Sequence, residues 1–207
     1  MIALTLFIAV AGGFAIGSLP FGVIVGRIFY RTDIRASGSG NIGAANALRT
    51  FGKGGGAAVL LLDVLKGFLP TAFGLHAGVA VGIAAATAAT LGHCYSPWLR
   101  FRGGKGVATM LGAFIAFSWL AAILSFVVWL VVVRVTRYSS VGSIAGCASA
   151  PLTLWLTTRN ADETAFVTFM AVFIVWRHRE NIARLRTGSE HTIALRRGPA
   201  GPESAPP

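Results

Sequence analysis

Long apolar runs without charged side chains dominate this sequence and leave few folds open to it. Residues 107–133 are 27 successive positions without a charge, and no Lys or Arg precedes Arg27. A helix of about 20 apolar residues crosses the hydrocarbon core of a bilayer. Because the 207-residue chain is 55% hydrophobic and only 12% charged, we predict an all-α polytopic membrane protein.

The basic residues lie in short clusters between the apolar runs. In a soluble protein the net charge of +11 would point to nucleic acid, but here we expect topology signals, anionic ligands and lipids, and no nucleic acid. All but one of the 18 Lys and Arg residues fall on one side if the chain crosses the membrane seven times; the exception is Arg159. By the positive-inside rule this side is cytoplasmic, which puts the amino terminus outside and the carboxyl terminus inside.

The seven expected spans follow from the apolar runs. Residues 107–133 as one helix would be about 40 Å long and would place Arg134 and Arg137 outside, so we split the run near Ser118. The spans are then about 2–29, 54–75, a third ending near 91, two within 107–133, a sixth to about 158, and 165–176. Polar turns are expected at 138–143 and 159–163. Residues 1–195 form a single transmembrane domain, and 196–207, rich in Pro and Gly, are predicted to be a disordered cytoplasmic tail.

A glycine-rich loop, Ser37-Gly38-Ser39-Gly40-Asn41-Ile42-Gly43-Ala44-Ala45-Asn46, lies between the first two spans. Glycines let several backbone N–H groups converge on one anion, and small hydroxyl and amide side chains add donors. The spacing fits neither the nucleotide P-loop nor the dinucleotide fingerprint. Taken alone, the loop is either a phosphate cradle or a flexible turn.

Two further polar islands lie on the same predicted face, at 92–106 and 177–190. The cationic candidates are Arg49, Arg100, Arg102 and Lys105, and the amides that would orient oxygens are Asn41, Asn46 and Asn181. Lys105 stands within Gly103-Gly104-Lys105-Gly106 at a helix start, where an anion-binding lysine is expected. His178, between two arginines, is expected to stay neutral. His93 at a span's inner end is either a ligand or a structural histidine.

Two ionisable residues, Asp63 and Lys66, lie three positions apart inside the second span. Such groups are costly at membrane depth and are expected to face the bundle interior or its cytoplasmic mouth. The sequence leaves structural pairing and substrate contact equally open. Cys94 and Cys147 do not indicate a disulfide framework, and we expect no metal, no cofactor and no obligatory protein partner.

Three ordered motifs resemble those of the bacterial acyl-phosphate:glycerol-3-phosphate acyltransferase family. The first is S-G-N-x-G-A-x-N at Ser39 to Asn46, and the third is R-H-R-E-N-I-x-R-L-x-x-G-x-E at Arg177 to Glu190. The second joins Gly92-His93 to Phe101 and to the G-G-K-G-V-A-T run that ends at Thr109. The likeness extends from Gly17 to Glu190. Ala45 stands where threonine is common, Arg102 where lysine is common, and Pro97 is displaced by one.

The resemblance implies an enzyme of the bacterial inner membrane that transfers a fatty acyl group from acyl phosphate to the sn-1 hydroxyl of glycerol 3-phosphate. The products are lysophosphatidic acid and phosphate. The implied catalytic residues are Ser39, Arg49, Lys105, His178 and Asn181. The implied substrate-binding residues are Gly40, Asn41, Gly43, Asn46, His93, Gly103, Gly104 and Ser143, of which Ser143 has the least distinctive surroundings.

The implied chemistry needs little covalent assistance, because an acyl phosphate is already an activated mixed anhydride. Positioning and charge stabilisation can supply most of the catalysis. No Ser-His-Asp or Cys-His arrangement is evident, and in the resembled family the substrate's own phosphate is thought to take the proton. No histidine here has aspartate five residues on, which excludes the H-x-x-x-x-D acyltransferases. The alternatives are a transporter of a phosphate compound, against which no internal repeat is visible, and a non-enzymatic lipid-binding protein.

Overall fold

The computed structural model describes residues 2–193, so the tail predicted at 196–207 lies outside the described residues. Within residues 2–193 every regular element is helical, which confirms the predicted all-α class. The α-helices are α1 (Ile2–Gly17), α2 (Phe21–Tyr30), α3 (Ala44–His76), α4 (Val79–Cys94), α5 (Val107–Phe117), α6 (Trp119–Thr136), α7 (Ser139–Thr158), α8 (Ala161–Arg177) and α9 (Arg179–Arg186), and the 3-10 turns are η1 (Ile34–Ala36) and η2 (Pro97–Leu99).

Within residues 2–193, four helical segments are long and apolar enough to cross a bilayer: Ile2–Tyr30, Ala44–His76, Val79–Leu99 and Trp119–Thr136. α5, with 11 residues, is apolar but shorter. Large apolar side chains are exposed along the helices, among them Phe7 at 69%, Phe73 at 74% and Val135 at 77%. Such side chains suit a hydrocarbon surrounding rather than water. The chain is therefore a membrane protein.

The break predicted within the apolar run 107–133 is confirmed. Ser118 has an extended backbone, with φ −156° and ψ 105°, and separates α5 from α6. Its hydroxyl oxygen accepts a hydrogen bond from the amide of Ala121 and so caps α6. A serine that satisfies a free amide of the first turn makes a new helix start favourable at this position.

The first predicted span matches the apolar segment Ile2–Tyr30, but the structure divides its helix into α1 and α2. The chain leaves helical geometry between Ser18 and Pro20, and Pro20 precedes α2 with φ −87° and ψ 70°. Proline has no amide hydrogen for a helix and disfavours helical geometry in the residue before it. The carbonyl oxygen of Leu19 at this break is taken by a side chain of α3, as described below.

The second predicted span starts ten residues too late, since α3 begins at Ala44 rather than Gly54. Residues 44–53 were expected to precede the span, but helix runs through them with a kink at Gly52, where φ is +75°. Only glycine adopts this geometry readily. The last three residues of the expected loop, Ala44 to Asn46, are consequently the first turn of a helix.

The last two spans also begin earlier than expected. Ser139 to Ser143, expected as a polar turn, form the first turns of α7. Asp162 and Glu163, expected in a loop, lie in the first turn of α8, where the Asn160 side chain caps the helix by accepting from the Glu163 amide at 3.1 Å. Acidic residues are stabilised at a helix amino terminus by the helix dipole, so a charged start for α8 is physically reasonable.

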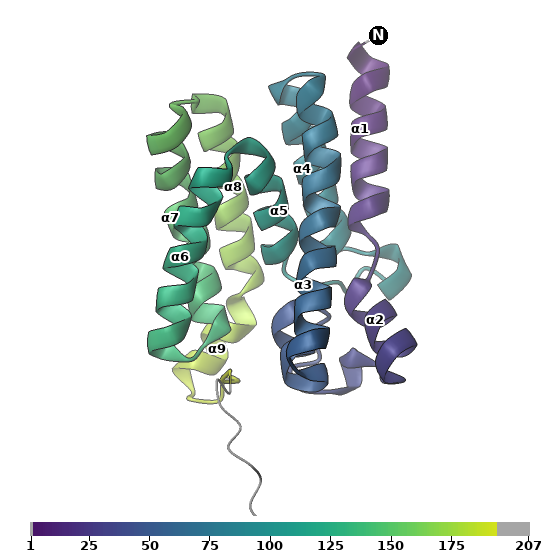
Figure 1. Ribbon diagram of the computed structural model, residues 1–207, viewed down its shortest axis with the longest axis vertical. Coiled ribbons are helices and arrows are strands. Elements are labelled where there is room, and N and C mark those ends of the chain that lie inside the picture. Colours follow the sequence, from purple (N-terminus) through teal and green to yellow (C-terminus); the bar gives the residue numbers. More distant parts are fainter. Residues whose placement is uncertain (1, 194–207) are drawn as a thin grey trace, which may run out of the picture.

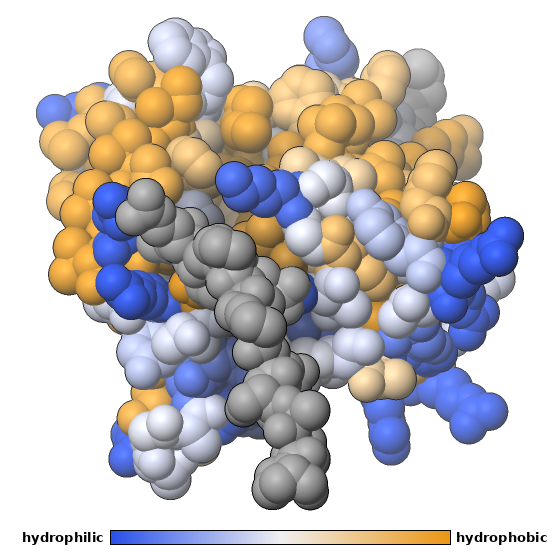
Figure 2. Space-filling view, turned by 60° about the horizontal axis from the view of Figure 1, so that its bottom comes forward, coloured by the Kyte–Doolittle hydropathy of each residue, from blue (hydrophilic) through white to orange (hydrophobic). Residues whose placement is uncertain are grey.

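The helices form two groups joined by α5 (Figure 1). In one group α1 packs against α4, and α3 packs against α4 and α5; in the other, α6 packs against α7 and α7 against α8. A core of buried apolar residues centres on Leu154, Met170 and Ile174 in the second group. The hydrophilic residues gather at the end of the molecule that carries α2 and α9, below a largely hydrophobic belt (Figure 2).

Candidate active site

The glycine loop is held by Asn46, which is 1% exposed. Its Nδ2 donates to the carbonyl oxygens of Ile34, Ser37 and Asn41, at 3.1, 3.0 and 2.8 Å. Its Oδ1 accepts from the amide of Ser39 at 2.9 Å. A methyl group at Gly38, where φ is +57°, would lie 2.2 Å from this Oδ1, so the loop requires glycine there. Asn46 thus shapes the loop, and its contact with substrate stays a prediction.

The loop's amides are only partly available for a ligand. The amides of Gly40 and Gly43 donate to Ser37 O and Asn41 Oδ1, at 3.0 and 2.9 Å. Within the described part of the chain, the amides at the start of α3, those of Ala44 and Ala45, have no hydrogen-bond acceptor. A helix amino terminus with free amides favours anions. The glycines therefore shape a cradle whose donors come chiefly from α3, rather than supplying all the donors themselves.

The second motif is clamped between two helix ends. The amides of Gly103 and Gly104 donate to the carbonyl oxygens of Cys94 and His93, both at 3.1 Å. From the other side, Arg177 Nη2 at the end of α8 donates to Gly104 O at 2.8 Å. Lys105 follows directly, one residue before the αL glycine that precedes α5. The clamp leaves Lys105 little freedom of position.

Lys105, Asn181 and Glu190 form one hydrogen-bonded chain. Lys105 Nζ donates to Asn181 Oδ1, and Asn181 Nδ2 donates to Glu190 Oε1 at 2.6 Å. Glu190 also accepts from Ser140 Oγ and Arg184 Nε, both at 2.8 Å. Burial would raise the pKa of Glu190, but hydrogen bonds from these three donors hold the pKa below its ordinary value. The carboxylate thereby fixes which way the Asn181 amide faces.

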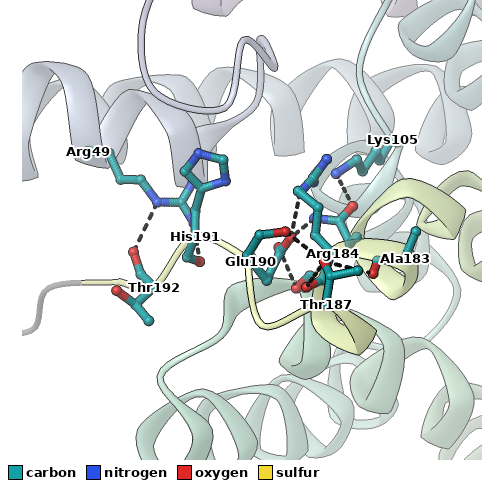
Figure 3. A network of polar contacts seen from close by, with 11 residues as sticks. Arg49, Lys105, Ala183, Arg184, Thr187, Glu190, His191 and Thr192 are labelled. Carbon is teal, nitrogen blue, oxygen red and sulfur yellow. Dashed lines mark hydrogen bonds and ion pairs between the residues drawn. The ribbon is translucent and has the colours of Figure 1, made fainter.

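Arg49 reaches the carboxyl-terminal segment of the described chain (Figure 3). Its Nε donates to Thr192 O at 3.1 Å and its Nη2 to His191 O at 3.2 Å. A guanidinium carries five N–H donors in a planar fork. Donors therefore remain on Arg49 for an anion, and the expected phosphate contact stays a prediction.

Two cavities meet at this site. The first, of about 350 Å³, runs between α3, α5, α6, α7 and α8, with mostly apolar walls that include Phe114, Trp129 and Ile174. The second, of about 930 Å³, is open and polar, with Arg35, Arg100, Arg102 and Arg184 in its wall. The residues shared by both cavities are Ser39, Asn41 and Lys105. An apolar pocket therefore ends where a basic one begins.

The sequence-predicted residues cluster around these cavities. Besides the three shared residues, the apolar cavity is lined by Gly43, Asn46, Arg49, His93, Ser143, His178 and Asn181, and the polar one by Gly40 and Gly103. Gly104 lines neither cavity and lies against the His93 ring instead. The structure therefore brings the three sequence islands to one place, as expected from topology. The catalytic and binding roles of these residues stay predictions.

Two residues of the site were not among those expected to act there. Glu190 holds Asn181, and Arg177 holds the Gly104 carbonyl oxygen. Glu190 is the last residue of the third motif and Arg177 is the first, so their place in the motif was the signal that could have identified them. Which neighbour each side chain meets depends on how α8 and α9 pack, and a linear pattern does not give that.

Burial shifts the pKa values of two titratable groups next to the cavities. Burial, followed by the nearby Arg184, lowers the pKa of Lys105 to about 8. Burial also lowers the pKa of His178 to about 4, which keeps the imidazole neutral at physiological pH, as predicted. His178 Nδ1 lies 2.8 Å from Ile174 O, so Nδ1 carries the proton and Nε2 is left as an acceptor.

The arrangement suits anion binding and charge stabilisation. Within residues 2–193, no hydrogen bond links Ser39 Oγ to a histidine or a carboxylate, which is the contact that activates a serine nucleophile. Nor is there, in this part of the chain, a group of three or more His, Cys, Asp or Glu side chains placed to hold a metal ion. Cationic donors at the junction of an apolar and a basic cavity fit a ligand that combines a lipid chain with phosphate.

Known proteins resemble this chain along most of its length. Residues 7–188 match the family described as glycerol-3-phosphate acyltransferase. A glycerol-3-phosphate acyltransferase of Synechococcus sp. is 44% identical over 191 residues, covering 92% of this chain and 96% of the relative. One from Zymomonas mobilis is 42% identical over 207 residues, covering 93% and 96%.

Two solved structures share the architecture. Both are PlsY (YgiH), described as an integral membrane glycerol 3-phosphate acyltransferase. The glycerol 3-phosphate form has a TM-score of 0.86 and 38% identity, covering 91% of this chain and 95% of that one. The lysophosphatidic acid form has a TM-score of 0.84, 37% identity, and coverages of 90% and 94%. The chain therefore belongs to the glycerol-3-phosphate acyltransferase family.

Proposed function

We propose that this protein transfers a fatty acyl group from acyl phosphate to the sn-1 hydroxyl of glycerol 3-phosphate, yielding lysophosphatidic acid and phosphate. The observation that carries the proposal is the junction at Ser39, Asn41 and Lys105, where an apolar cavity meets a basic one. An acyl phosphate has an apolar chain joined directly to a phosphate, so its reactive carbonyl belongs at such a junction. Family membership supports the acceptor.

The two substrates occupy the two cavities in this proposal. The acyl chain lies between the helices, against walls such as Phe114 and Trp129, because burial of its methylenes is favourable there. Glycerol 3-phosphate enters by the open cavity, whose arginines attract and hold a dianion. The hydroxyl of the acceptor then meets the carbonyl of the donor beside Lys105.

The site residues divide between the two phosphates. The Ser39 to Asn46 loop with the free amides of α3 cradles one phosphate, and Arg49, Lys105, His178 and Asn181 serve the other. Ser143 and His93 complete the wall of the apolar cavity. Each of these groups orients a substrate or offsets negative charge, and none forms a covalent bond.

The reaction is a direct displacement at the acyl carbon. The sn-1 oxygen forms the new ester bond, the bond between carbonyl carbon and phosphate oxygen breaks, and the hydroxyl proton leaves with the phosphate. Lys105, as an ammonium, stabilises the negative charge that develops on the oxygens. His178, whose pKa is about 4, is a weak base at neutral pH. It therefore accepts a hydrogen bond that orients the hydroxyl, while a phosphate oxygen of the substrate takes the proton.

The proposed setting is the bacterial inner membrane with the site facing the cytoplasm. Seven spans, with the amino terminus outside, put every cluster of Lys and Arg on one side and satisfy the positive-inside rule. The polar end of the molecule with α2 and α9 is consistent with this arrangement (Figure 2). The cytoplasm supplies glycerol 3-phosphate, and the bilayer receives the lipid product.

A donor comparison tests the function. Purified protein is incubated with glycerol 3-phosphate and equal amounts of palmitoyl phosphate, palmitoyl coenzyme A or palmitoyl carrier-protein thioester. We expect lysophosphatidic acid and one equivalent of phosphate from palmitoyl phosphate alone. Product from a thioester instead would contradict the proposed donor. Passage of labelled glycerol 3-phosphate across proteoliposomes, with no lipid product from any donor, would establish the transporter alternative.

A further inference from the structure

Three buried ionisable residues lie together behind the second motif. Asp63 and Lys66 of α3 are 1% and 2% exposed, and His93 near the end of α4 is 3% exposed. Lys66 Nζ lies 2.7 Å from Asp63 Oδ1, and His93 Nδ1 lies 3.7 Å from the same oxygen. The three side chains thus form one cluster at the centre of the first helix group.

Lys66 extends this cluster to the break between α1 and α2. Its Nζ donates to Leu19 O at 2.9 Å, the carbonyl next to Pro20. It also lies over the Phe21 ring, 5.5 Å from the centroid, a favourable cation–π distance. The lysine therefore ties α3 to the point where the first apolar segment is interrupted.

His93 extends the cluster in the opposite direction, to the second motif. Its carbonyl oxygen accepts from the Gly104 amide at 3.1 Å. A methyl group at Gly104 would lie 2.1 Å from His93 Nε2, so this ring nitrogen packs directly against the Gly104 backbone. The imidazole stands between Asp63 on its Nδ1 side and the loop before Lys105 on its Nε2 side.

A buried ion pair adds little net stability over a well-packed apolar pair, because desolvation offsets the attraction. The significance of Asp63 and Lys66 therefore lies in what they orient. The Asp63 carboxylate lies on the Nδ1 side of the His93 ring, and the ring packs against the Gly104 backbone. Arg177 holds the same backbone from the far side.

We propose that Asp63, Lys66 and His93 form a positioning network that sets the Gly103–Gly104 backbone and so places Lys105 Nζ at the junction of the two cavities. This proposal rests on the proposed function, in which Lys105 contacts the substrate. It decides between the two roles that the sequence leaves open for the intramembrane pair. The network acts chiefly through Lys105, although Asp63 and His93 also line the apolar cavity.

Two substitutions of His93 distinguish the roles of its two ring nitrogens. His93→Gln keeps a nitrogen or oxygen near the position of Nε2, against Gly104, whereas His93→Asn keeps one near Nδ1 and leaves the Gly104 side unsupported. Asp63→Asn combined with Lys66→Met removes both charges together, so that no unpaired charge is left buried. Thr71→Val is the matched control, because Thr71 is a fully buried polar residue of α3 whose hydroxyl bonds only to Gly67 O of the same helix.

The primary readout is the pH dependence of Lys105 acetylation by acetic anhydride, measured by mass spectrometry on the full chain in detergent. Only the neutral amine reacts, so the midpoint reports the lysine's own environment. In His93→Asn and in the double variant we expect the midpoint to rise by about one pH unit or more, since a displaced lysine regains water. The midpoint should shift less in His93→Gln than in His93→Asn, and Thr71→Val should keep the wild-type midpoint.

The second readout is kcat/KM with palmitoyl phosphate and glycerol 3-phosphate. It should fall at least about tenfold in His93→Asn and in the double variant, fall less in His93→Gln than in His93→Asn, and stay within about twofold in Thr71→Val. Loss of activity with an unchanged Lys105 midpoint would overturn the proposal and assign Asp63 or His93 to substrate. A shift of equal size in Thr71→Val would overturn it as well. If wild-type protein makes no lysophosphatidic acid, the proposed function fails, while the labelling comparison still decides the network.

Discussion

At the scale of single residues, Asn46 is the side chain on which the glycine loop depends. Asn46→Asp replaces the donating amide with an oxygen that faces three carbonyl oxygens, and each buried group left unpaired costs about 1–3 kcal/mol. We expect a lower thermal unfolding temperature in detergent and at least a tenfold loss of lysophosphatidic acid formation.

The matched control for this change is Asn160→Asp. Asn160 caps α8 through its side-chain oxygen, and aspartate is an equally good cap. The control should therefore unfold and react like the wild type. Equal activity of Asn46→Asp and Asn160→Asp would show that the loop does not need the amide.

If Lys105 acts as an ammonium in the reaction, as proposed, the reaction should be sensitive to alkaline pH. Its pKa of about 8 means that the ammonium is lost as the pH rises through 8, so kcat/KM should fall above this pH. In Lys105→Arg the guanidinium stays protonated throughout, because the ordinary pKa of arginine lies above 12. The alkaline fall should vanish in this variant, even if its maximal rate is lower. An unchanged alkaline limb would contradict a charged Lys105 in the reaction.

Much of the residue composition of the site followed from the sequence, because glycine loops, lysines at helix starts and motif histidines have recognisable chemistry. The hydrogen-bond partners of these side chains could not be predicted from the sequence. Asn46, which was expected to orient a ligand oxygen, also holds the loop, and Glu190 was not expected among the site residues. Both outcomes depend on tertiary packing, which places an amide or a carboxylate next to whichever groups the helices bring up.

At the scale of elements, the crossing of α1 and α4 depends on small residues. A methyl group at Gly17 would lie 2.1 Å from Ala89 O, whereas nothing lies within 4 Å of one at Gly12. The helices thus make a close contact at Gly17 and none at Gly12. Gly17→Ala should separate the two helices and lower the thermal unfolding temperature, while Gly12→Ala should leave it unchanged or raise it. Equal effects of the two substitutions would contradict the close crossing.

The helix boundaries show where sequence patterns carry enough information. The break at Ser118 followed from charge topology, and a serine cap accompanies it. The starts of α3 and α8 could not be predicted from the sequence, because glycine-rich and charged stretches both resemble loops. Asn160 and Glu163 were nevertheless a capping signal, and Pro20 was a break signal. The predicted boundaries followed the length of the apolar runs rather than these two signals. Hydropathy alone cannot distinguish one continuous helix from two helices in line.

At the scale of the whole molecule, the proposed topology makes the two ends of the bundle chemically distinguishable in a living cell. Ala77, between α3 and α4, and Ala36, before the glycine loop, are both exposed. With seven spans and the amino terminus outside, Ala77→Cys should react with a membrane-impermeant maleimide on intact spheroplasts. Ala36→Cys should react only after permeabilisation. The reverse pattern would invert the topology, and labelling of both on intact cells would contradict a single orientation.

In the proposed reaction, the placement of the junction lets one chain join a lipid donor to a water-soluble acceptor. The apolar cavity lies among the helices and the basic cavity opens at the polar end, so each substrate comes from the phase in which it dissolves. Ser39, Asn41 and Lys105 stand where the two meet. The central claim is that the acyl group crosses this junction in one step, without attachment to the protein.

A single-turnover experiment with radiolabelled palmitoyl phosphate tests this claim most directly. Excess protein is mixed with the donor, with and without glycerol 3-phosphate, and quenched with acid. Without the acceptor, we expect that no phosphate is released and no label stays on the protein. With the acceptor, labelled lysophosphatidic acid and phosphate should appear together, one phosphate for each lysophosphatidic acid. A burst of phosphate with acylated protein in the absence of glycerol 3-phosphate would contradict the claim.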